Sequence, residues 1–291
     1  MVKNNESVDL QLDNTPIPYN ERNKLIKKSD IQKILKKYDV DIEIRDINIF
    51  YEAFTHKTYI IKDLNCEIMK KARQQYSNNI VELQKNSYER LEFLGDTVLK
   101  MIISMYLFER YPNRDEGFMT RLKTKIENRQ KLSYLSKEVG LDEYIIISKQ
   151  IETMTGRTSD KILEDIFEAF IGALCIDTAP DITICTKFVR NILEYEIDFS
   201  DLLYKDTNYK DQLLRHYHKN KWGHPEYDKL HEEGPPHKRT FTCGVKDNDG
   251  NYIGIGIDKS KKKAEQIASM KALEHFNLLN PDQVCETEIC I

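Results

Sequence analysis

Several acidic residues lie inside an apolar stretch of the sequence, where carboxylates are unfavourable unless a partner compensates their charge. Residues 87–111 read SYERLEFLGDTVLKMIISMYLFERY, which has the apolar spacing of a helix. At about 100° per residue, Glu89, Glu92 and Asp96 fall within an arc of roughly 60°. Apolar residues cover nearly every other direction, which predicts a buried helix. Stacked carboxylates on such a helix would repel each other and lose hydration, at several kcal/mol per ion.

A second apolar stretch repeats this pattern. Residues 158–178 read TSDKILEDIFEAFIGALCIDT, and an apolar stripe runs along one face of the helix they predict. Asp165 and Glu168, three residues apart, share the opposite face with Ala169 and Gly172. Such small neighbours let another helix or a ligand approach closely.

Together the two helices offer carboxylates that can form an all-oxygen cage. Mg²⁺ and Mn²⁺ prefer oxygen ligands in octahedral geometry. A pair of such ions can clamp a phosphodiester, one generating the attacking hydroxide and the other stabilising the leaving oxygen. The alternative is that these acids form a solvated helix face or pair with nearby lysines, as most single acidic residues do.

Helical periodicity extends well beyond these two stretches and predicts an all-α domain over 21–196. The predicted segments are 21–37, 46–56, 88–110, 114–126, 129–139, 159–176 and 183–196. Residues 62–87 are polar and read as an insertion or surface excursion, either an inert loop or one that alters contacts near the acids. Residues 1–20 read as a disordered arm and 197–205 as a linker.

The pattern changes over 206–276, where an α-β-β-β-α order predicts an α+β domain with both helices on one face of a sheet. The predicted helices are 206–219 and 260–276, with Ser260 as N-cap, and the strands are 226–231, 239–245 and 252–257. This segment has 13 Lys and Arg against 11 Asp and Glu, whereas the whole chain has a net charge of −4. A mildly basic module beside an acidic one suits a nuclease. Residues 277–291 read as a flexible tail.

Lysines gather at the start of the last predicted helix, in KSKKKAEQIASMKALEHF at 259–276. The positive end of the helix dipole adds to their charge, which favours phosphate binding there. The Pro-fixed loop GPPHKRTF at 234–241 carries His237 and Lys238 and can reach into a shallow RNA minor groove. Taken alone, such lysines are most often a solvated helix start or a localisation signal.

The motifs resemble those of the ribonuclease III family. ERLEFLGDTVL at 89–99 is similar to the family signature, and EDIFEAFIGAL at 164–174 resembles its second acidic motif. AFTHKTY at 53–59 and the segment 111–132, which includes Glu-Gly, match further stretches. The resemblance implies an all-α endonuclease domain that cleaves double-stranded RNA and leaves 5′-phosphate and 3′-hydroxyl ends with short 3′ overhangs.

The resemblance also assigns roles to single residues. It assigns catalysis and Mg²⁺ binding, with Mn²⁺ as a substitute, to four carboxylates: Glu92, Asp96, Asp165 and Glu168. Glu89 and Glu116 match auxiliary acids near the site. Phe93 matches an aromatic residue that the family inserts into the partner subunit of a homodimer.

The segment 206–276 resembles a double-stranded-RNA-binding domain. The resemblance places Gln212 where the first helix meets the minor groove, and it assigns RNA contact to the lysine cluster Lys261, Lys262 and Lys263. Asp258 departs from the family pattern, which often has glycine there, and we expect it to weaken RNA affinity slightly. Domains of this kind read A-form shape more than base sequence, so a steep salt dependence is expected.

Composition argues against secreted and membrane proteins. The start of the chain has no apolar signal region, and the longest mostly apolar stretch, 166–176, is shorter than the roughly 20 residues a bilayer requires. The six cysteines have no CxxC or zinc spacing, so we expect reduced thiols and an intracellular, cytoplasmic protein; a Cys285–Cys290 disulfide is the alternative.

Two other functions compete with the nuclease. A non-catalytic RNA-binding protein on the same fold would explain the lysines, and a helical dimerisation scaffold would explain the apolar helices. Neither requires the intact set of embedded acids, which favours the enzyme.

Overall fold

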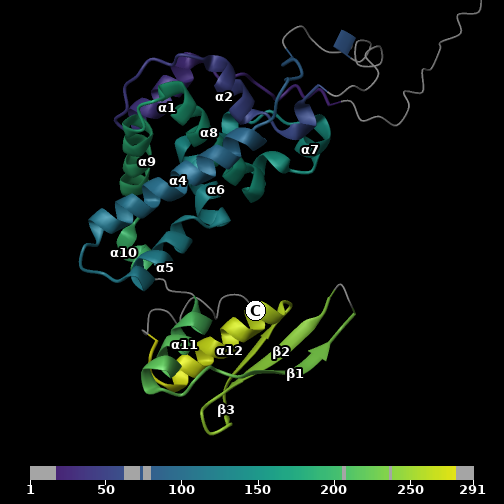
Figure 1. Cartoon of the computed structure of the whole chain (residues 1–291). Helices are drawn as coiled ribbons and strands as arrows, with labels where there is room; N and C mark the ends of the chain where they lie inside the picture. The colour runs from purple at the N-terminus through teal and green to yellow at the C-terminus, as the bar shows by residue number, and fades with distance from the viewer. Residues whose placement is uncertain (1–17, 62–72, 75–79, 205–207, 236–237, 280–291) are drawn as a thin grey trace, which may run out of the picture. The chain divides into compact units, whose positions relative to one another are not determined.

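The protein folds into two units, a helical one up to Asp198 and a smaller mixed one from Phe199 onward (Figure 1). The computed structural model describes residues 18–61, 73–74, 80–204, 208–235 and 238–279. The order of elements confirms an all-α unit followed by an α-β-β-β-α unit. Within the described residues, no helix combines the length and apolarity that crossing a lipid bilayer requires.

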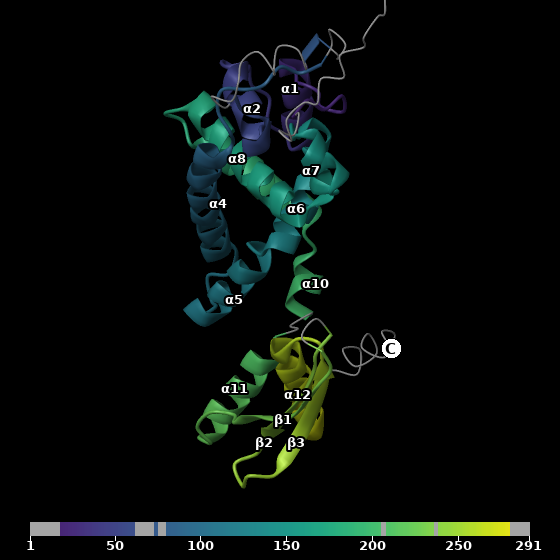
Figure 2. The same cartoon turned by 90° about the vertical axis from the view of Figure 1, so that its right-hand side faces the viewer.

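In the described residues, the first unit is built from α-helices and three short 3-10 turns. The α-helices are α1 (Lys28–Lys37), α2 (Ile47–Phe54), α4 (Glu89–Arg110), α5 (Glu116–Ile126), α6 (Arg129–Val139), α7 (Lys149–Thr153), α8 (Asp160–Thr178) and α9 (Thr183–Glu196). The turns are η1 (Lys57–Tyr59), η2 (Asp142–Tyr144) and η3 (Gly156–Thr158). Helix α8 is central, since it packs against α2, α4, α6 and α9 (Figure 2).

Helices α4 and α8 meet with their backbones in contact. A Cβ atom at Gly95 of α4 would lie 1.8 Å from the carbonyl oxygen of Glu168, and one at Gly172 of α8 would lie 2.2 Å from that of Leu91. Any side chain at either glycine would therefore force the helices apart. The two glycines fix the closest approach of the helices that carry the predicted carboxylates.

Side-chain caps define where the helices begin. Asp46, Asp115 and Asn128 accept hydrogen bonds from backbone N–H groups in the first turns of α2, α5 and α6. These bonds satisfy donors that have no partner within the helix. Helix α6 ends at Gly140, whose φ of +84° suits glycine. Local sequence therefore sets these helix boundaries.

Two boundaries in the structure differ from the predicted ones, because distant parts of the chain contact the residues there. The end of the predicted arm is packed: Asn20 is fully buried and donates to the carbonyl of Ile147 at 3.2 Å. The end of the predicted insertion is also packed, since the hydroxyl of Tyr59 donates to the buried Val81 carbonyl at 2.7 Å. Residues 1–17, 62–72 and 75–79 lie outside the described residues.

The prediction that 88–110 forms a helix buried on all sides is wrong for the single chain. Along α4, Phe93 is 79% exposed and Phe108 is 70% exposed, while Met101 and Met105 are almost half exposed. The opposite face is buried in the unit. Helix α4 therefore has two apolar faces, of which its own chain covers one.

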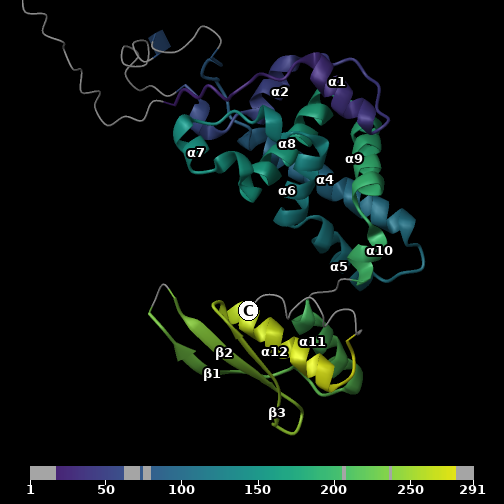
Figure 3. The same cartoon turned by 180° about the vertical axis from the view of Figure 1, so that it is seen from behind.

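The second unit is a three-stranded antiparallel sheet with two helices on one face (Figure 3). It comprises α10 (Phe199–Tyr204), α11 (Tyr209–Asn220), β1 (Tyr227–Glu233), β2 (Thr240–Lys246), β3 (Tyr252–Asp258) and α12 (Lys261–His275). The strand order is β1-β2-β3, with Glu233 opposite Thr240 and Phe241 opposite Asp258. This arrangement confirms the predicted α+β order.

Two glycines bring β3 close to α12. A Cβ atom at Gly254 or Gly256 would lie 2.1 Å from a backbone carbonyl of α12, at Ala268 or Ala264 respectively. The core around this contact consists of Leu213, Tyr217, Val245, Ala268, Ala272 and Leu273. The strand's alternate residues Ile255 and Ile257 are exposed on the other face.

Two local predictions for this unit need correction. The predicted linker 197–205 contains helix α10. Ser260 is the N-cap residue of α12, as predicted, although its side chain makes no cap bond and its own N–H donates to Asp258 Oδ1 at 2.7 Å. The predicted tail begins later than expected, because Leu279 packs against the core. Residues 280–291 lie outside the described part.

We expect Gly172→Ala to lower the free energy of unfolding of the helical unit by about 3 kcal/mol or more, because the added methyl group meets backbone atoms that cannot move aside. Denaturant unfolding followed by circular dichroism measures the change. Gly117→Ala is the matched control, since its nearest obstacle is the flexible Arg121 side chain at 3.2 Å. Equal stability of the two variants would contradict the prediction.

Candidate active site

The four predicted carboxylates lie where α4 and α8 touch. Glu92 and Asp96 belong to α4 and flank Gly95, while Asp165 and Glu168 belong to α8, whose Glu168 carbonyl contacts that glycine. Asp165 is 7% exposed and Glu168 is 8% exposed, and the other two are half-buried. The helix contact therefore brings acids together that are about 70 residues apart in the sequence.

Burial, and after it repulsion from neighbouring acids, favours the protonated forms of Glu92, Asp165 and Glu168. Burial, followed by the charge of Asp96, raises the pKa of Glu168 to about 9. Burial, followed by the charge of Asp165, raises the pKa of Glu92 to about 7. Burial also raises the pKa of Asp165 itself. The negative charge of these carboxylates is only partly balanced by nearby cationic side chains.

Tyr88 holds one of the buried carboxylates. Its hydroxyl, at the start of α4, donates to Asp165 Oδ2 at 2.9 Å, and the residue is only 3% exposed. The ring of His56 packs against the Tyr88 ring with centroids 5.7 Å apart. His56 Nδ1 lies 2.8 Å from Thr58 Oγ1, and burial lowers the pKa of His56 to about 4. A neutral imidazole thus supports the tyrosine that orients Asp165.

One lysine pairs directly with a predicted ligand. Lys100 Nζ donates to Asp96 Oδ2 at 2.8 Å, one helical turn away on α4. Lys161 opposes the rise in the pKa of both Glu92 and Asp165. These ammonium groups offset part of the negative charge.

The two auxiliary acids differ in how they relate to the four carboxylates. Glu89 is exposed, pairs with Lys57 Nζ at 3.2 Å, and its pKa is lowered chiefly by that hydrogen bond. It also interacts electrostatically with Glu92. Glu116 begins α5 and accepts from Thr120 Oγ1 at 2.7 Å. Within the described residues, no hydrogen bond or ion pair joins Glu116 to the four acids.

The four carboxylates act on one another electrostatically: Asp96 and Glu92 on Glu168, and Asp165 on Glu92. Across the described residues, no three side chains of His, Cys, Asp or Glu form a group with the geometry of a metal site. The donor set itself, all oxygen and partly desolvated, is the type that Mg²⁺ and Mn²⁺ prefer.

In the second unit, the predicted phosphate-binding residues gather at one end of the sheet. Lys238 lies between β1 and β2, and Lys261, Lys262 and Lys263 form the first turn of α12. Phe241 pairs with Asp258, so the start of β2 and the end of β3 share that end. All four lysines are exposed. His237 lies outside the described residues.

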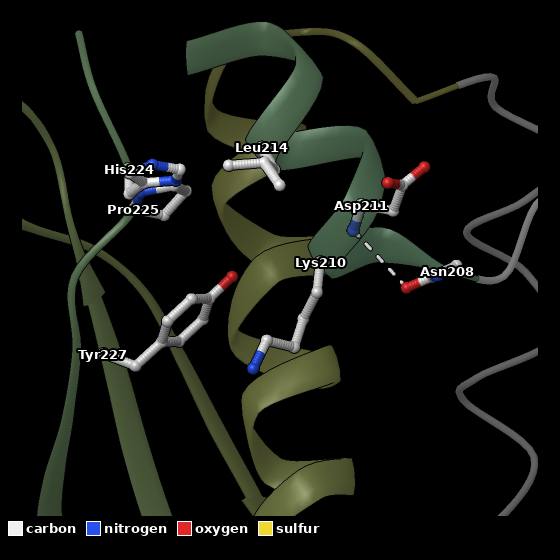
Figure 4. Close-up of a pocket in the computed structure, with 7 residues that line it drawn as sticks. All are labelled: Asn208, Lys210, Asp211, Leu214, His224, Pro225 and Tyr227. Atoms are coloured by element: carbon white, nitrogen blue, oxygen red, sulfur yellow. Dashed lines mark hydrogen bonds between the residues drawn. The ribbon is translucent and has the colours of Figure 1, made fainter. Parts of the chain in front are cut away.

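Helix α11 packs against α12, whose first turn lies at this end of the sheet. Lys210 Nζ pairs with Glu265 at 2.6 Å and lies 4.4 Å from the ring centroid of Tyr227. Figure 4 shows Lys210 and Leu214 of α11 facing Tyr227 across a pocket of about 330 Å³. Gln212 lies in the second turn of α11, next to the buried Leu213. The predicted RNA-contacting elements therefore belong to one packed module.

Sequence reasoning missed several residues around the carboxylates. Tyr88 has no local signal, because its partner Asp165 is 77 positions away. Lys100 has a detectable one, since it stands four residues after Asp96. Glu127, a half-buried acid after α5, interacts electrostatically with Asp96 and Lys100, but nothing in its own segment indicates this.

Comparisons with known proteins agree with the two units. The family model "Ribonuclease III domain" matches residues 89–179, and "Double-stranded RNA binding motif" matches residues 209–275. The chain is 36% identical over 233 residues to ribonuclease 3 of Enterococcus faecalis, covering 80% of this chain and 92% of that protein. The chain belongs to the ribonuclease III family.

A viral relative is more similar in sequence but longer. A probable ribonuclease 3 of Acanthamoeba polyphaga mimivirus is 43% identical over 263 residues, covering 89% of this chain. The chain spans about half the length of that relative, 47%. Among solved structures, the nuclease domain of ribonuclease III from Campylobacter jejuni matches with 27% identity and a TM-score of 0.44, covering 57% of this chain and 99% of that domain.

We expect acid to destabilise the helical unit partly through His56. Its pKa of about 4 in the folded chain lies below the ordinary value of 6.5, so the unfolded chain binds more protons between these values. The stabilisation is complete above the ordinary value and is lost as the pH falls through about 4. The unfolding free energy should depend less steeply on pH in this window in His56→Asn, and the difference summed over the window should be about 3 kcal/mol at most. His231→Asn, on the exposed surface, is the control, and equal slopes in both variants would refute the role of His56.

Proposed function

We propose that the protein is a divalent-metal-dependent endoribonuclease that cleaves double-stranded RNA. The observation that carries this proposal is the joining of α4 and α8, which places Glu92 and Asp96 beside Asp165 and Glu168 in a partly desolvated site. Membership of the ribonuclease III family supports the same function.

The chemistry of the donors, all carboxylate oxygens, suits a divalent cation. We propose that Mg²⁺, or Mn²⁺ in its place, is held by four carboxylates: Glu92, Asp96, Asp165 and Glu168. Burial is the main cause that raises the pKa of Glu92, Asp165 and Glu168, and a cation would stabilise their ionised forms. When bound, such ions supply an activated water and charge stabilisation at phosphorus.

The surrounding side chains prepare this arrangement. Tyr88 holds Asp165 by its hydroxyl, which leaves the second carboxylate oxygen available for another contact. Burial of Glu168 lowers the local dielectric constant and strengthens its attraction for positive charge. Among the described residues around the four acids, no serine, cysteine or histidine approaches as a nucleophile, so water is the nucleophile we propose. Attack by water with departure of the 3′ oxygen yields a 5′-phosphate and a 3′-hydroxyl.

We infer that two copies of the chain act together. Phe93 is 79% exposed beside the site, and it lines a cavity of about 630 Å³ with Leu94 of α4 and Ile176 of α8. An exposed apolar face of this kind favours self-association. Two sites, each cutting one strand, would give products with short 3′ overhangs.

The second unit is the part of the chain that we propose binds RNA. We propose that Lys238 and the first turn of α12 bind phosphates across a groove, while Gln212 meets the minor groove. The exposure of these lysines at one end of the sheet supports this role, as does the positive end of the α12 dipole. The match to the RNA-binding motif model supports it as well.

Glu168→Gln is expected to reduce the rate of duplex RNA cleavage in Mg²⁺ by at least about a thousandfold while leaving RNA affinity within about twofold. The amide keeps the shape of the side chain but loses the negative charge that a cation requires. Cleavage of long duplex RNA on gels measures the rate, and product-end analysis checks for 5′-phosphate and 3′-hydroxyl ends. If wild type and variant both bind duplex RNA and neither cuts it, the protein is a non-catalytic RNA-binding protein.

Replacing Lys262 and Lys263 together by alanine should flatten the dependence of RNA affinity on salt, by about one unit of log–log slope for each lost phosphate contact. Lys271→Ala, on the exposed side of the same helix farther from its start, is the matched control. Binding titrations with duplex RNA at several salt concentrations measure the slope. An unchanged slope in the double variant would place the phosphate contacts elsewhere.

A further inference from the structure

Lys100 is the side chain that already brings a positive charge to Asp96. Its Nζ atom lies 2.8 Å from Asp96 Oδ2, and the side chain is 49% exposed. The carboxylates of Glu127 and Glu168 act on the same ammonium group electrostatically. Lys100 is thus bonded to Asp96 and also feels the charge of Glu127, an acid outside the proposed ligand set.

Glu127 offers that lysine a second acceptor. It follows α5 as the C-cap residue, and its side chain is 14% exposed. Its Oε1 atom is buried and accepts no hydrogen bond; the nearest cation, Lys123 Nζ, is 3.7 Å away. A buried carboxylate oxygen without a hydrogen bond is costly, so a further donor would stabilise it.

A divalent cation and an ammonium group on one carboxylate repel each other, so cation binding at Asp96 must displace Lys100. The lysine side chain is flexible and partly exposed, which lets it move without disturbing the helix. Release into water alone would leave Glu127 without its missing donor.

We infer that Lys100 is a positioning residue that holds Asp96 while no divalent cation is bound and transfers its hydrogen bond to Glu127 when a cation replaces it. The inference rests on the proposed function, because it assumes that Asp96 binds metal. It makes cation affinity depend on two residues outside the ligand set. A simple helix-stabilising pair between residues four apart would make cation affinity depend on Lys100 but not on Glu127.

Metal binding without RNA tests the inference. Mn²⁺ is titrated into the full chain, and free Mn²⁺ is followed by electron paramagnetic resonance. Lys100→Met should bind Mn²⁺ about three- to tenfold more tightly, because the competing ammonium group is gone. Lys24→Met is the matched control. Lys24 is 50% exposed and its Nζ atom lies 2.7 Å from Glu143 Oε2, and neither residue belongs to the site. This control should leave the affinity unchanged.

A double-mutant cycle separates transfer to Glu127 from a general effect of its charge. Glu127→Gln should weaken Mn²⁺ binding about two- to fivefold in the wild-type background, because Lys100 then keeps Asp96. In the Lys100→Met background the same substitution should change the affinity less than about 1.5-fold. Equal losses in both backgrounds would overturn the transfer, because they would show that Glu127 acts only through its charge.

The outcomes also separate this inference from the proposed function. A wild-type chain that binds Mn²⁺ and cuts duplex RNA, with Lys100→Met binding no more tightly, overturns the role of Lys100 alone. A wild-type chain that neither binds Mn²⁺ nor cuts RNA removes the proposed function and this inference with it. Lys100→Gln repeats the measurement with a polar side chain, should the methionine variant fail to fold.

Discussion

Backbone contact between α4 and α8 is the constraint on which the site depends. Because Gly95 and Gly172 have no side chains, each helix rests directly on a carbonyl of the other, and the acids beside the contact cannot move apart independently. The packing therefore keeps these acids both buried and close to one another; burial, followed by repulsion from a neighbouring carboxylate, raises the pKa of Glu92 and of Glu168. The remaining freedom lies in the side chains, where Tyr88 and Lys100 supply partial compensation.

Periodicity in the sequence predicted most helices because helix formation is largely a local property. Helix α6 was predicted with its observed bounds and α4 to within one residue. The same geometry placed the acids on common faces. Contacts between distant segments could not be predicted this way: Asn20 is buried because it meets Ile147, and Tyr88 joins the site because it meets Asp165. No pattern within either segment encodes its partner.

The exposed face of α4 shows a second limit of sequence reasoning. A helix that is apolar on all sides can be buried within its own chain or against another molecule, and the periodicity is the same in both cases. Only the fold shows that Phe93 and Phe108 remain uncovered while Ile102 and Ile103 are fully buried. The acids share this helix, so whatever covers the exposed face also affects the surroundings of the site.

The division of charge between the units follows from the chemistry of the site. A carboxylate cluster that attracts divalent cations also repels the phosphates of RNA, so affinity for the substrate must come from elsewhere in the chain. Residues 206–276 have a net charge of +2, and lysines gather at the start of α12, while the rest of the chain is acidic. A single domain holding both sets would let lysines neutralise the carboxylates, as Lys100 does at Asp96. If the proposed function holds, separate units keep phosphate binding from competing with cation binding.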